Sequence, residues 1–312
     1  MPQPQPQPQP QVATTYEDTK QKQVSVALER SPELRESAAS DGLLGQLQEK
    51  LKKVNIDGTE YFVAEGDTLL DKDELVFYAH SRQRVAEARK AAALADSAGL
   101  GFQTLDDPDR SALVAVTQNG KIVRWQPGTV LSYRVVKSTF TSIANYNTVV
   151  TNMKKATEAW ETTCGVTFQH RVDLDTAPGV DPAGMLFAVR EINASGSFIA
   201  SAFFPNDPPD RRRVLIDPSY FSTSFDLVGV LRHELGHVLG FRHEHIRSEA
   251  PPACPNEPQF DAANLSKYDP KSVMHYFCGG VGTTQLAISD IDVTSSRKVY
   301  GMPLNSFTMI TA

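Results

Sequence analysis

Residues 231–245, LRHELGHVLGFRHEH, constrain this chain more than any other stretch, because they hold four of its seven histidines. His233 and His237 are four residues apart, so on a helix both imidazoles lie on one face and can reach one metal ion. Gly240 can adopt the left-handed conformation that ends a helix, and the resulting turn lets His243 approach as a third ligand. The segment therefore predicts a metal-binding helix followed by a return of the chain.

The pattern also indicates which metal chemistry to expect. Three neutral imidazoles with one open coordination position suit a catalytic zinc ion, whereas a structural zinc site is closed by four protein ligands. Glu234 follows the first histidine and can act on a water molecule as a general base, which predicts hydrolysis of an amide or an ester. The alternative is an amphipathic helix with surface histidines, and it requires the positions of Gly240 and His243 to be accidental.

The same residues resemble a known signature. The run H-E-x-x-H-x-x-G-x-x-H at residues 233–243 is similar to the zinc-binding signature of the metzincin peptidases. Ser-Val-Met-His-Tyr at residues 272–276 resembles the methionine turn of the astacin family, and Glu244 follows the third histidine as in astacins. The stretch FIASAFFP at residues 198–205 is similar to matrixins. The chain thus resembles an astacin-like metzincin of a bacterial type, with some matrixin-like features.

This resemblance assigns roles to particular side chains. It implies a zinc-dependent metalloendopeptidase in which Glu234 is the general base and then the general acid toward the leaving amine. Met274 would form a hydrophobic floor under the metal. Tyr276 would ligate zinc in the resting enzyme and stabilise the oxyanion of the transition state. One zinc ion is expected on the three histidines of the signature, His233, His237 and His243.

Apolar periodicity outside the signature predicts an α+β fold. Helical spacing is clear at residues 142–163, and a capping box at Ser289 and Asp292 starts a last helix that Gly301 ends. The metzincin resemblance covers about residues 111–301 and implies a twisted, mostly parallel sheet with a long first helix, the active-site helix, the methionine turn and a C-terminal helix. Strands are expected at residues 128–136, 165–171, 184–191, 196–204 and 214–217.

The chain divides into three parts by composition. Residues 1–35 form a disordered leader rich in proline and glutamine. Residues 36–110 form a small α+β unit that resembles a propeptide, with a helix expected at residues 43–54 and a polar linker at residues 101–111. Residues 111–312 form the catalytic domain.

The propeptide-like unit contains a candidate latch. Astacin zymogens carry an F-x-G-D segment whose aspartate binds the zinc, and YFVAEGD at residues 61–67 resembles it, although the spacing of the phenylalanine differs. Asp67 would then occupy the open zinc position until cleavage near residues 106–113, after which the new N-terminus would lie near Glu244. The alternative is a simple turn, because Gly-Asp is a common turn pair.

Three cysteines cannot all pair within one chain. Astacins have four, and Met302 stands here where the partner of Cys164 would be, so the resemblance implies that Cys164 is buried and unpaired. It leaves a hypothetical disulfide between Cys254 and Cys278. His245 is expected to face away from the metal, at the surface or behind the ligands.

Charge and hydropathy limit the partners. The net charge of −6 gives no sign of nucleic-acid binding, and no apolar run approaches the ~18 residues of a spanning helix. The expected partners are protein or peptide substrates of a monomer, which the resemblance places outside the cell although residues 1–20 lack signal-peptide features. The arginines at residues 211–213 are expected in a solvated basic loop, or else at a cleft rim that attracts acidic substrates.

Two other functions would use the same site. One is a catalytically idle module that binds zinc or peptides. The other is a zinc amidase or esterase that acts on non-peptide bonds.

Overall fold

The computed structural model describes residues 42–80, 82–83, 113–118, 120–179, 184–247, 249–254 and 262–304. The leader predicted for residues 1–35 and the linker predicted for residues 101–111 lie outside these ranges. Among the described helices, none combines the length and hydropathy needed to span a membrane.

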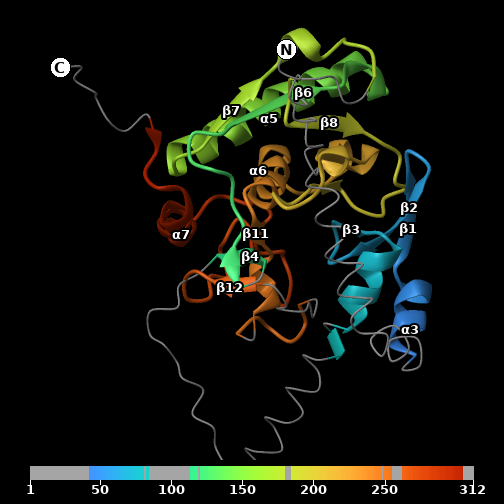
Figure 1. Cartoon of the computed structure of the whole chain (residues 1–312), viewed down its shortest axis with the longest axis vertical. Coiled ribbons are helices and arrows are strands. Elements are labelled where there is room, and N and C mark those ends of the chain that lie inside the picture. The colour runs from blue at the N-terminus through green and yellow to red at the C-terminus, as the bar shows by residue number, and fades with distance from the viewer. Residues whose placement is uncertain are drawn as a thin grey trace, which may run out of the picture.

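A twisted sheet of five strands forms the upper half of the molecule in Figure 1, in the order β7-β6-β8-β10-β9. The first four strands are parallel, and only the edge strand β9 pairs antiparallel, with β10. This confirms the mostly parallel sheet expected from the sequence. The strands are β6 (Val130–Val135), β7 (Thr167–His170), β8 (Phe187–Glu191), β9 (Ala200–Ser201) and β10 (Arg213–Ile216).

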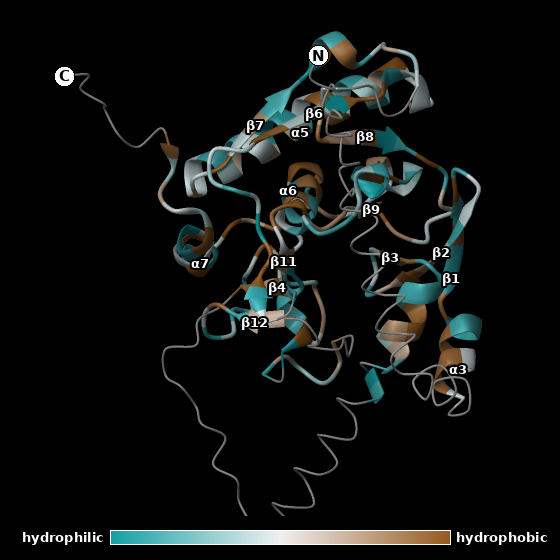
Figure 2. Cartoon of the chain, viewed as in Figure 1, coloured by the Kyte–Doolittle hydropathy of each residue, from teal (hydrophilic) through white to brown (hydrophobic). Residues whose placement is uncertain are grey.

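Two helices cover one face of this sheet. The long helix α5 (Ile143–Thr163) begins at Ser142, whose hydroxyl accepts the backbone N–H of Asn145. Helix α6 (Leu227–Val238) begins at Asp226 and packs against α5, and Figure 2 shows it as largely hydrophobic. The main core lies between these helices and the sheet, because the two helices and the inner faces of the strands all contribute apolar side chains to it.

The last helix, α7 (Asp290–Tyr300), has the predicted capping box. The Ser289 hydroxyl accepts the backbone N–H of Asp292, whose carboxylate in turn accepts the N–H of Ser289. The Asp292 carboxylate also accepts the hydroxyl of Ser272 and the N–H of Val273, so this cap holds the segment that precedes Met274.

A smaller sheet joins the start of the catalytic domain to the end of α6. Strand β4 (Val114–Gln118) pairs antiparallel with β11 (Phe241–Arg242), with β12 (Ala262–Asn264) and with β5 (Lys121–Ile122). Strand β11 directly precedes His243, so this sheet fixes the path of the chain after α6. The short 3₁₀ helices are η1 (Lys137–Thr139), η2 (Val172–Leu174), η3 (Pro209–Arg211), η4 (Pro218–Ser222) and η5 (Glu244–Ile246).

The N-terminal unit, residues 42–80, is an α+β element as predicted. Helix α3 (Leu43–Lys50) precedes an antiparallel sheet of β1 (Lys52–Ile56), β2 (Thr59–Ala64) and β3 (Thr68–Leu70), and residues 72–80 are helical. The helix expected over residues 43–54 is wrong beyond Lys50, because Val54 and Ile56 alternate inward in a strand that pairs with β2.

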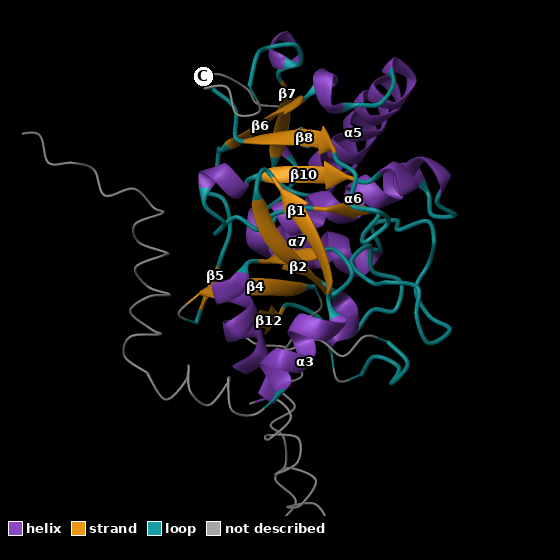
Figure 3. Ribbon diagram, turned by 90° about the vertical axis from the view of Figure 1, so that its right-hand side faces the viewer, coloured by secondary structure: helices purple, strands orange, loops and turns teal. Residues whose placement is uncertain are grey.

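This unit packs on the face of the main sheet opposite to α5 and α6, and Figure 3 shows β1 and β2 crossing in front of the strands. The strand pleat explains the arrangement, because Val214 and Ile216 point into the main core while Leu215 points to the other side. Leu215 and Phe198 there contact residues of β1 and β2, among them Val54 and Tyr61.

Candidate active site and metal centre

Three histidines converge below the main sheet. His233 and His237 lie one turn apart on α6, and Gly240, at a φ of 89°, turns the chain so that β11 delivers His243 to them. The Nε2 atoms of His237 and His243 are 3.2 Å apart. All three rings are buried, and one ligand atom from each lies within 4.8 Å of the others and of an Asp67 carboxylate oxygen.

The hydrogen bonds of these rings prepare them for a metal. The Nδ1 of His233 is 2.8 Å from the carbonyl of Val273, and the Nδ1 of His237 is 2.8 Å from that of Phe241. Because a carbonyl only accepts, each Nδ1 carries the proton, and the Nε2 of the neutral ring presents a lone pair to the centre. Burial lowers the pKa of His237 to about 4, so this ring is neutral at pH 7.

Zinc fits this donor set. Four tetrahedral ligands at ~2.0–2.1 Å from a zinc ion lie roughly 3.3 Å from one another. Besides the 3.2 Å separation of the two imidazole nitrogens, an Asp67 oxygen is 3.1, 3.4 and 3.6 Å from the Nε2 atoms of His243, His233 and His237. Among the described residues, the buried Nε2 of His233 has no hydrogen-bond partner, as expected for a metal ligand.

Asp67 reaches the centre from the turn between β2 and β3. Its carboxylate also accepts a hydrogen bond from the Tyr276 hydroxyl. Gly66 has a φ of 93°, and a Cβ atom there would lie 2.9 Å from the Tyr276 ring, so glycine is required both by conformation and by space. Burial favours the neutral acid, but His243, with His233 and His237, holds the pKa of Asp67 well below its usual range.

Glu234 lies buried beside the histidines. Its Oε2 has no hydrogen-bond partner among the described residues. Burial and the neighbouring Asp67 carboxylate raise the pKa of Glu234 well above its usual range. The site therefore holds a carboxyl group poised to carry a proton, beside three histidines suited to a metal.

The methionine turn supports the helix from below. Met274 is fully buried, and a Cβ atom added at Gly236 would lie 2.3 Å from its sulfur. Met274 thus lies directly against α6 at Gly236, a position between the two helical histidines in sequence. The backbone carbonyl of Met274 accepts the N–H of Glu244, which ties the turn to the segment that follows His243.

His245 lies behind the ligands, the second of the two positions expected from the sequence. It is not at the surface, because only 2% of it is exposed. Its ring stacks on His243 at a centroid distance of 4.9 Å and on Tyr276 at 4.8 Å. The fold thus buries it against a ligand ring, and it is not among the described residues whose ligand atoms meet at the metal position.

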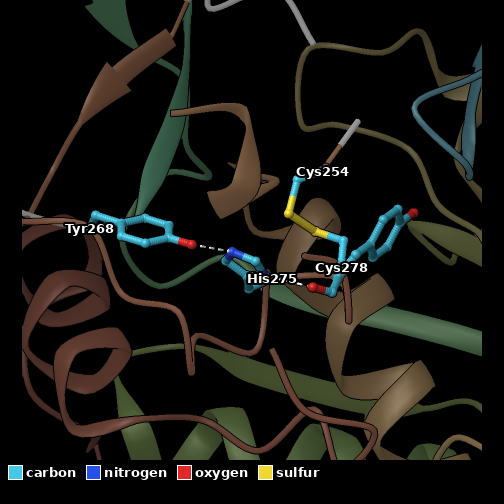
Figure 4. Close-up of a disulfide and its surroundings, with 5 residues drawn as sticks. Cys254, Tyr268, His275 and Cys278 are labelled. Carbon is cyan, nitrogen blue, oxygen red and sulfur yellow. Dashed lines mark hydrogen bonds between the residues drawn. A yellow bond between two sulfur atoms is a disulfide. The ribbon is translucent and has the colours of Figure 1, made fainter. Parts of the chain in front are cut away.

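The structure contains a disulfide between Cys254 and Cys278, the pair expected from the sequence. Figure 4 shows it beside His275, whose Nε2 lies 2.7 Å from the Tyr268 hydroxyl. Although His275 and the two sulfurs lie close enough to hold a metal ion, the sulfurs are consumed by the bond. Cys164 is buried and unpaired, and burial raises the pKa of its thiol to about 12.

Arginines near the site bind the N-terminal unit, and the sequence did not indicate this. Arg242, next to the third histidine, donates to both carboxylate oxygens of Glu65 at 3.1 and 3.2 Å. The solvated basic loop expected at residues 211–213 is also wrong, because Arg211 binds Glu74 and Arg213 binds Tyr61. The only signal for these contacts was the density of acidic residues between positions 57 and 74.

A comparison with protein families matches the matrixin model to residues 124–277, a range that contains the three histidines and the methionine turn. An astacin-like metalloendopeptidase of Coturnix japonica is 33% identical over 23% of this chain and 25% of that protein. The chain thus covers about a quarter of the length of this curated relative.

Two solved structures show weaker likeness. A structure of myroilysin has 16% identity and a TM-score of 0.42, and the match covers 60% of this chain and 98% of that one. High choriolytic enzyme 1, a hatching enzyme zinc-protease from Oryzias latipes, has 16% identity and a TM-score of 0.37, over 60% and 99% of the two chains.

The family match spans the three histidines, Glu234 and the methionine turn but not Asp67. Metzincins use one catalytic zinc ion, which the three histidines fit. Together with the astacin-like relative, this match makes residues 124–277 similar to a metzincin-type zinc metallopeptidase domain with matrixin features.

Proposed function

We propose that this chain is a zinc metalloendopeptidase that hydrolyses peptide bonds in proteins and is made as an inactive precursor. The arrangement of three histidine nitrogens around one point, with the unpartnered Oε2 of Glu234 beside them, carries the proposal. An unsatisfied buried carboxylate oxygen is costly unless a ligand or a reaction uses it.

His233, His237 and His243 would hold the zinc ion, which supplies Lewis acidity toward a peptide carbonyl and toward water. Glu234 takes a proton from the attacking water and delivers it to the leaving amine. The Tyr276 hydroxyl, which binds Asp67 in this structure, donates to the oxyanion once Asp67 has left. Met274 packs against α6 at Gly236 and so helps to hold the two histidines of that helix in place.

The edge strand β9 is the proposed binding site for substrate. Ala200 and Ser201 pair with β10 on one side, and no other described strand pairs with β9 on the other side. An extended peptide can add to such an edge through main-chain hydrogen bonds. This favours peptide substrates over the small amides or esters of an alternative hydrolase.

Asp67 is the proposed latch of the precursor. Its carboxylate takes the position beside the three histidines that a substrate carbonyl or water needs. A simple surface turn, the alternative, would leave this side chain in solvent, whereas only 5% of Asp67 is exposed. Cleavage near residues 106–113 would separate the N-terminal unit from the catalytic domain.

Glu244 is the proposed partner of the new N-terminus. It is fully buried, and its Oε2 has no hydrogen-bond partner among the described residues. Its Oε1 accepts the N–H of Asp269, in the segment that Leu265 ties to Leu113 through a 2.7 Å backbone hydrogen bond. The start of the catalytic domain therefore runs near this carboxylate.

The disulfide supports an extracellular location, because such bonds persist in oxidising compartments. We propose that the enzyme is secreted and acts as a monomer. The idle binding module is the less favoured function, since holding zinc or peptide does not require Glu234 beside the histidines.

The test is Glu234→Gln in the protein cut at the linker. Zinc-loaded wild type should degrade casein, and the variant should lose about 10²–10⁴-fold in kcat because the proton carrier is gone. Metal analysis should still find one zinc per chain in the variant. Casein cleavage that survives both this substitution and chelation of zinc would exclude the proposed mechanism. A cleavage profile on a peptide library would separate the peptidase from a hydrolase of non-peptide bonds.

A further inference from the structure

The outer face of the main sheet carries three arginines that the proposed catalysis does not use. We call Arg190 on β8, Arg211 before β10 and Arg213 on β10 the outer arginine face. Arg190 donates to both carboxylate oxygens of Asp57, at 2.7 and 2.8 Å, and Arg213 reaches the same carboxylate at 3.3 Å. Arg190 and Arg213 therefore both bind the N-terminal unit in this structure.

Arg211 completes the set on the other side of the unit. Its Nη1 is 2.7 Å from Glu74 and 3.4 Å from Asp71. The guanidinium groups of Arg211 and Arg213 also lie 5.3 and 5.5 Å from the ring centre of Tyr61, which adds cation–π contacts. The N-terminal unit thus offers three acidic residues and an aromatic ring to three arginines.

The sheet geometry holds these arginines in a fixed array. Arg213 and Leu215 point outward from β10, and Arg190 lies opposite Leu215 in the parallel register. The arginine side chains are only 9–15% exposed, and Leu215 and Phe198 form an apolar centre between the sheet and the unit. Departure of the unit would uncover an apolar patch with a basic rim.

The charge distribution agrees with this complementarity. Residues 1–110 contain 13 Lys and Arg and 19 Asp and Glu, so they carry the entire net charge of −6. Residues 111–312 contain 18 of each kind and are balanced. Removal of residues 1–110 would therefore take the acidic partners away from the outer arginine face.

The face also lies beside the proposed path of the substrate. Strand β9 runs antiparallel to β10, with Ser201 opposite Leu215, so the chain beyond Ser201 runs toward Arg213. A long polypeptide that pairs with β9 would pass close to the outer arginine face.

We infer that the outer arginine face is a second substrate-binding site of the proposed peptidase, uncovered when the N-terminal unit leaves, and that it binds acidic polypeptide segments with aromatic or aliphatic side chains. The inference rests on the proposed function for its biological role. Binding at this face is nevertheless measurable without catalysis. Ion pairs at a partly desolvated rim add selectivity and sensitivity to salt.

The test uses the full chain with a protease site inserted within residues 101–111 and with Glu234→Gln, which prevents turnover. After cleavage at that site, the N-terminal unit is removed in about 1 M NaCl, which screens its ion pairs. Two labelled peptides share one cleavable core. One is extended by alternating Glu, Asp, Tyr and Leu, and the other has Gln and Asn in place of the acids. Fluorescence anisotropy should give about tenfold tighter binding of the acidic peptide, with a smaller gap at about 0.5 M NaCl.

Arg190→Gln with Arg213→Gln should abolish this preference, and Arg213→Lys alone should retain most of it. Arg171→Gln is the matched control, because Arg171 pairs with Asp173 on the same domain and away from the unit. If Arg190→Gln impairs folding, as judged by circular dichroism, Arg211→Gln with Arg213→Gln replaces it.

Equal binding of the two peptides would overturn the inference, as would a preference that survives the double substitution or a unit that high salt cannot remove. The proposed function is tested separately, by cleavage of the short core peptide with Glu234 intact. Failure of that cleavage with the binding preference preserved would reject only the peptidase.

Discussion

At the scale of the residue, two buried polar atoms are the most informative feature of the histidine site. The Nε2 of His233 and the Oε2 of Glu234 are buried without hydrogen-bond partners among the described residues. A buried polar atom without a hydrogen bond destabilises the fold by ~1–3 kcal/mol. Such an atom is therefore expected where a ligand or a reaction uses it. The opposite nitrogen of His233 is fully engaged by a carbonyl, which directs the remaining lone pair to the metal position.

Asp67→Ala tests the latch at this scale. Removing the carboxylate frees the position beside the three histidines, so the uncut protein should gain measurable activity on a short peptide, whereas the uncut wild type stays silent. Peptide hydrolysis before and after cleavage of the linker provides the measurement.

Asp73→Ala is the matched control, because Asp73 is an exposed residue of the same unit. It should leave the uncut protein silent. Equal latency of Asp67→Ala and wild type would show that the carboxylate does not keep the enzyme inactive.

At the scale of the element, two glycines explain how closely α6 is packed. Gly229 and Gly236 lie seven residues, or about two turns, apart on one face of the helix. A Cβ atom at Gly229 would lie 2.3 Å from the carbonyl oxygen of Gln285, and one at Gly236 equally close to the Met274 sulfur. The chain that carries the methionine turn therefore fits against the helix only because both side chains are missing.

Gly236→Ala should accordingly destabilise the protein by about 1–3 kcal/mol, the usual cost of overpacking, although alanine is the better helix former. Thermal unfolding measures the effect. Gly45→Ala in α3 is the control, since no atom lies within 4 Å of its added Cβ, and it should be neutral or stabilising. Equal behaviour of the two variants would contradict the packing argument.

The same elements show what the sequence could predict. The ligands, the helix caps and the Gly240 turn were predictable because each depends on residues a few positions apart. The contact between Arg190 and Asp57 was not, because 133 residues separate the partners and no local pattern joins them. The sequence predicts a helix over residues 52–54, because the pairing with β2 that makes them a strand is tertiary.

At the scale of the whole molecule, the N-terminal unit contacts the catalytic domain in two places with different chemistry. The Asp67 carboxylate lies beside the three histidines, while Asp57 and Glu74 bind arginines on the outer face of the sheet. The second contact combines an apolar centre with ion pairs, and the strength of the ion pairs should depend on pH.

Asp57→Asn tests this dependence. The hydrogen bond from Arg190 lowers the pKa of Asp57 below 3.8, so its stabilisation is present above pH ~4 and is lost as pH falls through the lowered pKa. The side chain is 47% exposed, so solvent screening limits the effect to about 1 kcal/mol or less. The melting temperature should fall at pH 7 and match wild type once the pH lies below the lowered pKa of Asp57.

Asp73→Asn should leave the melting temperature unchanged at both pH values. A difference between Asp57→Asn and wild type that is as large at low pH as at pH 7 would mean that the contact is not ionic.

The unequal distribution of charge between the two parts has a colloidal consequence. The whole chain has an isoelectric point near 5.7 and is an anion at neutral pH, whereas residues 111–312 alone carry balanced charge. Molecules near their isoelectric point lose mutual repulsion and associate more readily. Cleavage near residue 110 would therefore convert an anionic protein into one with balanced charge, which tends to adsorb to surfaces and to self-associate.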